Sequence, residues 1–96
     1  GLVHVLVVEV DLRLPDAHSL KDKRQVVRSI LDTNRRRFGV GAAEVAHQDH
    51  WQRAVLGFAA VGSTAAHVDE LIGAVEDAIW AHPGVEVLRM ERSWLE

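Results

Sequence analysis

The stretch AHQDHWQRAV, residues 46–55, contains two histidines, two glutamines, an aspartate, a tryptophan and an arginine. His47, Asp49 and His50 are of the types that bind zinc or iron, because neutral imidazole and carboxylate groups are common ligands of these metals. All three lie within four residues of a predicted turn, whereas catalytic metal sites normally collect their ligands from separate elements. The segment therefore favours a structured turn over a metal centre, and we expect no bound metal.

The same side chains are suited to ordering a hairpin. An aspartate in a turn accepts hydrogen bonds from nearby backbone N–H groups, which is the role predicted for Asp49. His47, Gln48 and Gln52 are predicted to form hydrogen bonds around the turn. Trp51 is predicted to act as a hydrophobic clamp with its indole N–H at the rim. Together with Arg53, this hairpin is interpreted as a recognition surface.

No other part of the chain carries a recognisable catalytic pattern. There is no Ser-His-acid set in a known context, no glycine-rich phosphate loop and no carboxylate pair isolated in an apolar run. Glu44 and Arg53 could face each other across the hairpin, and an ordinary cross-strand ion pair accounts for them. Acylphosphatases have the fold class derived below, but LPDAHSLK lacks their glycine- and arginine-containing anion loop. We expect neither an enzyme nor a cofactor.

Positive charge is concentrated in residues 19–38. The whole chain has a net charge of −3, yet this segment carries +5 and the remainder −8. The basic residues of the segment are Lys21, Lys23, Arg24, Arg28, Arg35, Arg36 and Arg37. They could contact a phosphate backbone, or they could pair with a second, acidic helix. The stacking aromatics of an RNA-recognition motif are absent, since Phe58 falls in the helix-facing set of its strand.

Length and composition indicate one domain, residues 1–96. A chain of 96 residues with 48% hydrophobic residues can bury a single core. Because it has no cysteine, disulfides are excluded and a reducing compartment is permitted, so we expect a cytoplasmic protein. The apolar run at residues 1–14 lacks a basic leader and alternates with charge, which predicts a strand and not a membrane segment.

Periodicity predicts six elements. Strands are expected at residues 2–14, 40–47, 53–61 and 85–95, where apolar residues alternate or form short runs. Helices are expected at residues 20–38 and 65–79, where apolar residues recur at helical spacing. Ser19 and Asp22 imitate a capping box at the start of the first helix, and Gly39 provides its stop.

The order β-α-β-β-α-β predicts an α+β, ferredoxin-like sandwich. Both helices should cover one face of a four-stranded antiparallel sheet whose first and third strands are central. The uncovered face should then present the apolar side chains Val3, Val5, Val7, Val55, Ala59 and Val61. Exposed apolar residues of this kind usually mark an interface, so we expect a homo-oligomer, with a dimer favoured, that covers this face or a sheet edge.

Three segments resemble the YlxP-like family of small bacterial proteins, a family of unknown function: HSLKDKRQVVRSI, FGVGAAEVAHQDHWQRAVLGFAAV and ERSWL. The resemblance extends over nearly the whole chain. It implies a ferredoxin-like fold and a cytoplasmic bacterial protein, whose genes often neighbour those of translation factors. It implies no activity, cofactor or catalytic residue. His50 stands at the variable place of the H-Q-D-x-W-Q-R motif, which argues further against a metal.

Two classes of function remain open. The chain is either a non-enzymatic binding module for RNA or the translation and ribosome machinery, acting through the basic helix and the HQDHWQR hairpin. Alternatively, it is a dimeric protein-interaction or small-ligand regulatory domain that binds no nucleic acid.

Overall fold

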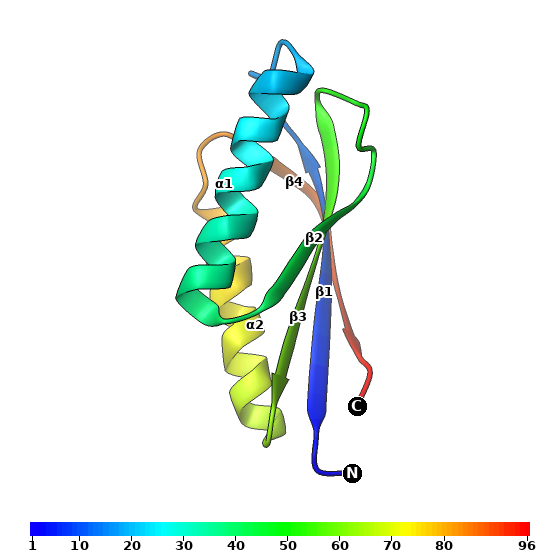
Figure 1. Ribbon diagram of the computed structural model, residues 1–96, viewed down its shortest axis with the longest axis vertical. Helices are drawn as coiled ribbons and strands as arrows, with labels where there is room; N and C mark the ends of the chain where they lie inside the picture. Colours follow the sequence, from blue (N-terminus) through cyan, green and yellow to red (C-terminus); the bar gives the residue numbers. More distant parts are fainter.

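The computed structural model describes residues 1–96 and has the expected order of elements. The elements are β1 (His4–Arg13), α1 (Leu20–Phe38), β2 (Gly41–Ala46), β3 (Arg53–Gly62), α2 (Ala65–Trp80) and β4 (Glu86–Trp94). Figure 1 shows both helices on one side of the sheet, whose other face is uncovered. The predicted boundaries are met to within two residues. Neither helix is long and apolar enough to cross a membrane.

The sheet has the strand order β2-β3-β1-β4, which confirms the central position of β1 and β3. All neighbouring strands are antiparallel, and Val5 pairs with Val61 while Leu6 pairs with Ala60. Because side chains alternate between faces along a strand, this register places all the even-numbered apolar residues of β1 on the helix side. They are fully buried there, together with Leu56 and Phe58 of β3.

Local signals set the limits of α1. The Ser19 hydroxyl accepts a hydrogen bond from the Asp22 N–H at 3.0 Å, and the Asp22 carboxylate accepts one from the His18 N–H at 3.0 Å. At the other end, Gly39 has a φ of 65° and donates its N–H to the Arg35 carbonyl. This left-handed conformation suits glycine, which has no Cβ to clash. The predicted cap and stop are therefore both confirmed.

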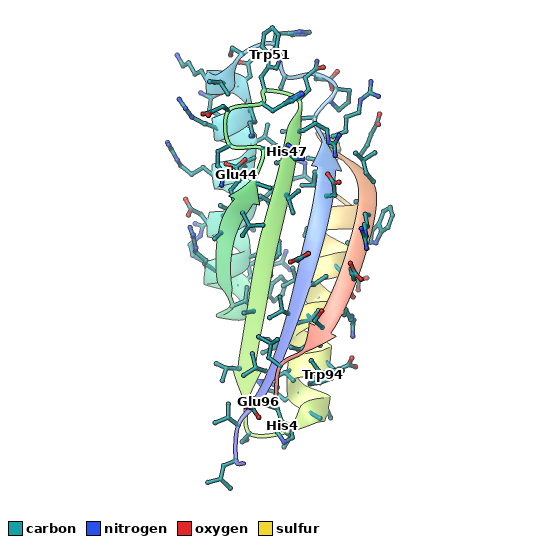
Figure 2. The ribbon with its side chains drawn as sticks, turned by 90° about the vertical axis from the view of Figure 1, so that its right-hand side faces the viewer. His4, Glu44, His47, Trp51, Trp94 and Glu96 are labelled. Carbon is teal, nitrogen blue, oxygen red and sulfur yellow. The ribbon has the colours of Figure 1, made fainter.

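The uncovered face is apolar at one end and charged at the other. Val61 is 64% exposed and pairs with Val5, and Val7 pairs with Ala59 beside them, whereas Val55 pairs with Asp11 and lies among the charged residues. Further along, the same face carries Glu9, Asp11, Arg13, Arg53, Arg89 and Glu91. Figure 2 looks onto this face, with the helices behind the sheet. The expectation of an uncovered apolar face thus holds for about half of its length.

Candidate binding surface

Lys23 does not lie on the exposed basic face where the sequence placed it. Its side chain is fully buried, and its ammonium donates hydrogen bonds to the carbonyls of His47 and Gln48. The Lys23 ammonium nitrogen also lies 2.7 Å from Oε2 of Glu44. The two groups form an ion pair, although their geometry is not that of a directed hydrogen bond. A buried ammonium needs such partners, because the removal of an unpaired charge from water costs on the order of several kcal/mol. Lys23 therefore joins α1 to the hairpin and cannot contact phosphate.

The turn between β2 and β3 is shaped to receive this lysine. His47 has a φ of 63°, a left-handed conformation that is uncommon for residues other than glycine. Its carbonyl accepts both the Lys23 ammonium and the N–H of His50. The hairpin is thus ordered by backbone carbonyls, by a lysine from α1 and by the His50 ring, whose Nδ1 accepts the N–H of Gln52 at 3.1 Å. The side chains of His47, Gln48 and Asp49 form no hydrogen bond in the turn, which corrects the roles predicted for them.

Gln52 fastens the hairpin to the loop before α1. Its side-chain amide donates to the carbonyls of Ala17, at 3.1 Å, and Pro15, at 3.4 Å. Its backbone carbonyl accepts the N–H of Leu14 at 2.9 Å. These bonds span more than thirty residues of sequence, so the turn, the loop and the start of α1 form one rigid unit.

Arg53 pairs with Asp11 and not with Glu44, which corrects the ion pair expected from the sequence. One guanidinium nitrogen of Arg53 lies 2.9 Å from each carboxylate oxygen of Asp11. Glu44 points to the helix side, since its cross-strand partner is the buried Leu56, whereas Arg53 lies on the uncovered face. The two side chains are therefore on opposite faces of the sheet.

The tip of the hairpin remains exposed. The side chains of His47, Gln48, Asp49, His50 and Trp51 all face solvent, and Trp51 is 49% exposed rather than serving as a clamp. Figure 2 shows Trp51 at the end of the molecule beside the start of α1. The rings of His47 and His50 stand edge to face, 6.3 Å apart. No group of three acidic or histidine side chains here or elsewhere could hold a metal ion.

Four basic side chains follow one another along the exposed side of α1. Lys21, Arg24, Arg28 and Arg35 recur at intervals of three, four and seven residues, which places them in one stripe. None of Lys21, Arg24 and Arg28 forms an ion pair or side-chain hydrogen bond with the rest of the chain. A shallow groove of about 340 Å³ runs beside the stripe, lined by Arg24, Val27, Arg28, Leu31, Arg35 and Glu44. We call Lys21, Arg24, Arg28 and Arg35 the basic stripe.

The three consecutive arginines at the end of α1 are partly engaged within the chain. Arg35 pairs with Asp32 at 3.0 Å and donates to the carbonyl of Ala42 on β2. Arg36 donates to the Asp32 carbonyl, and the Arg37 guanidinium lies 4.9 Å from the centre of the Phe38 ring. The freest cations of the helix are therefore those nearer its N-terminus.

The acidic helix does not neutralise the basic one. Asp69 and Glu76 of α2 both bind Arg92 of β4, and the hydrogen bond to Glu76 raises the pKa of Arg92 above its ordinary value. No ion pair joins α1 to α2. The pairing of the two helices that the sequence allowed is thus absent: Arg92 of β4 is the partner of Asp69 and Glu76, and Glu70 and Asp77 form no ion pair.

The sequence did contain a signal for the buried lysine. Lys23, Val27, Ile30 and Asn34 are spaced four, three and four residues apart, and all four are buried. This is the spacing of the core-facing side of a helix. A lysine in that register needs an acidic or carbonyl partner from another element, and Glu44 and the turn provide it.

Comparison with known proteins identifies a family and a similar fold. Residues 5–92 match the family model described as a protein of unknown function (DUF503). The chain is 34% identical over 86 residues to the uncharacterized protein YlxP of Bacillus subtilis (strain 168), covering 90% of this chain and 94% of that protein. A de novo designed protein, Foldit4, has the same fold, with a TM-score of 0.55, 15% identity and coverage of 93% and 96% of the two chains.

Proposed function

This chain belongs to the DUF503 family of proteins of unknown function, and we propose that it is a non-enzymatic module that binds RNA through α1 and the hairpin tip. The proposal extends to RNA within a ribonucleoprotein such as the ribosome, in the cytoplasm. It involves no catalytic step and no cofactor.

The unpaired cations of the basic stripe carry the proposal. Lys21, Arg24 and Arg28 are exposed and have no acidic partner, although the chain as a whole is acidic. From Lys21 to Arg35 the stripe runs about 21 Å along the helix axis, at 1.5 Å per residue. Such a row can hold several phosphates of one strand, and phosphate contacts supply most of the sequence-independent affinity for nucleic acid.

The hairpin tip adds an aromatic surface to this row. Lys23 and Gln52 hold the tip against the start of α1, so Trp51 and the first cations of the stripe belong to one continuous surface. A base that leaves its stack can lie on an exposed indole ring, which accepts any of the bases. We therefore assign single-stranded RNA, bound with little sequence preference, as the ligand.

The sheet itself takes no part in this mode of binding. Phe58 is buried beneath the helices, and β1 and β3 offer no aromatic residue on the uncovered face. The proposal thus differs from the binding of an RNA-recognition motif, in which aromatic residues of the sheet stack on bases.

Binding to RNA should depend steeply on salt. Three phosphate contacts predict a slope of about −2 for the logarithm of the association constant against the logarithm of salt concentration. Fluorescence anisotropy with a labelled single-stranded RNA oligonucleotide measures this slope. The titration is repeated at salt concentrations from about 50 to 200 mM, a range over which phosphate contacts change the affinity strongly. Absence of binding, or affinity that is unchanged by salt, would refute the proposal.

Replacing Trp51 with alanine separates this function from the alternative. If RNA is bound, W51A should lower affinity about tenfold through lost stacking and leave the salt slope unchanged. If the chain is instead a protein-interaction or small-ligand regulatory domain, no RNA binding exists to be lost. In that case, Trp51→Ala should weaken capture of a protein partner more than any change in the basic stripe does, because buried aromatic residues dominate protein interfaces. Gln48→Ala serves as the matched control at the tip, because this exposed side chain forms no hydrogen bond within the chain.

A further inference from the structure

The outer edge of β4 is long, apolar on its flanks and uncovered. β4 is the last strand in the order β2-β3-β1-β4, contains no proline and runs for nine residues. Its register against β1 shifts at Leu88, which is an extra residue in β4, and residues 89–94 form the regular part of the strand. Leu88 and Trp94 within it are 49% and 51% exposed. A strand edge of this kind presents unpaired N–H and C=O groups that another strand can bind.

Trp80 of α2 is a third exposed apolar side chain beside the outer edge of β4. Arg92 of β4 binds Asp69 and Glu76, so the α2 face that carries these residues looks toward β4. Trp80 is one helical turn beyond Glu76 and therefore on this face. It is 61% exposed. Two tryptophans and a leucine thus flank an edge that nothing within the chain covers.

The charges of β4 are arranged for pairing with a second copy of themselves. Arg89 and Glu91 stand on either side of Met90 and form an ion pair with each other at 2.7 Å, which is largely exposed and therefore easily exchanged for other partners. If two β4 strands run antiparallel about Met90, the Arg89 of each copy lies opposite the Glu91 of the other. The two neighbouring registers that keep side chains on their own faces would place Arg89 opposite Arg89, or Glu91 opposite Glu91. Only the register centred on Met90 brings opposite charges together, which stabilises a cross-strand pair.

We propose that the chain forms a homodimer by antiparallel pairing of β4 with β4, with the twofold axis at Met90. The pairing yields one eight-stranded sheet, a size within the usual range. Met90 already packs against the core from its half-buried position, and the Met90 side chains of the two copies extend that core across the axis.

The edge is a better interface than the uncovered face. Half of that face is occupied by charged side chains, including Glu9, which lies directly opposite Glu91 and has no ion-pair partner. Pairing through β4 leaves the basic stripe free, since α1 lies over β2 at the other edge of the sheet. The dimer does not depend on the proposed RNA binding.

Charge reversal in β4 tests the proposal by sedimentation equilibrium. The wild-type protein should have twice the monomer mass of 10.6 kDa. Arg89→Glu should raise the dissociation constant about tenfold, because two attractive cross-strand pairs become repulsive. The double variant R89E/E91R should restore the dimer, since it exchanges the two charges. A wild-type monomer at high concentration, or a dissociation constant that R89E does not change, would overturn the proposal.

Two controls place the interface on the molecule. Val61→Asp introduces a charge at the apolar end of the uncovered face and should leave the dimer intact. If V61D dissociates the dimer while R89E does not, the uncovered face is the interface and the proposal is wrong. In addition, the outward amides of β4 should exchange hydrogen faster on dilution below the dissociation constant. Equal protection at all concentrations would contradict strand pairing.

Discussion

Replacing Lys23 with methionine should reduce the free energy of unfolding by about 3–5 kcal/mol, because it breaks a buried ion pair by removing one partner. The change leaves Glu44, whose side chain is only 18% exposed, without its counter-charge. It also leaves the carbonyls of His47 and Gln48 without their donor. A loss of this size is a large fraction of the stability of an ordinary small domain. Urea unfolding followed by circular dichroism measures it.

Two variants control for this effect. Lys21→Met removes the same charge two residues earlier, at an exposed position, and should change stability by less than about 0.5 kcal/mol. The double variant Lys23→Met, Glu44→Leu should recover part of the loss, because no uncompensated carboxylate remains. If K23M were as stable as the wild type, Lys23 would not join the helix to the turn in solution.

Replacing Arg24 and Arg28 together with glutamate should weaken binding to single-stranded RNA by about 100-fold or more at low salt. Each charge-assisted hydrogen bond contributes about 1.5–3 kcal/mol, and the variant removes two of them. The salt slope should become shallower by about 1.4, which corresponds to two phosphate contacts on a single strand. Both side chains are exposed and unpaired, so the fold should be unaffected. The same anisotropy titration measures affinity and slope together.

The position of the charge, and not its amount, should decide the result. Arg28→Glu and Arg13→Glu change the net charge equally, but Arg13 lies on the uncovered face beside Glu86. Only R28E should lose affinity substantially and reduce the slope. Arg35→Glu should have a smaller effect on binding than R28E, because Asp32 and the Ala42 carbonyl already hold its guanidinium. Equal losses in R28E and R13E would indicate non-specific attraction and contradict a site on α1.

The sequence alone determined the architecture because its signals are local. Alternation along β1 assigned Val8 and Val10 to the core, and both are buried. A hydroxyl at residue 19 and a glycine at residue 39 set the limits of α1 through bonds that span three or four residues. Periods and caps of this length can be recognised without knowing what lies across the fold. The placement of Phe58 beneath the helices followed from the same alternation.

The tertiary structure alone decided which charged groups meet. The contacts of Lys23 with the turn span 24 and 25 residues, the Arg53–Asp11 pair spans 42, and Arg92 reaches back 16 and 23 residues to α2. Each partner depends on the register of a strand or the rotation of a helix, and a shift of one residue in a strand moves a side chain to the opposite face. Of the seven basic residues, the spacing marks Lys23 as core-facing, but the sequence does not say which groups it meets. Packing separated one that is buried and structural from those that remain free, because burial of a charge requires partners that only the folded chain brings together.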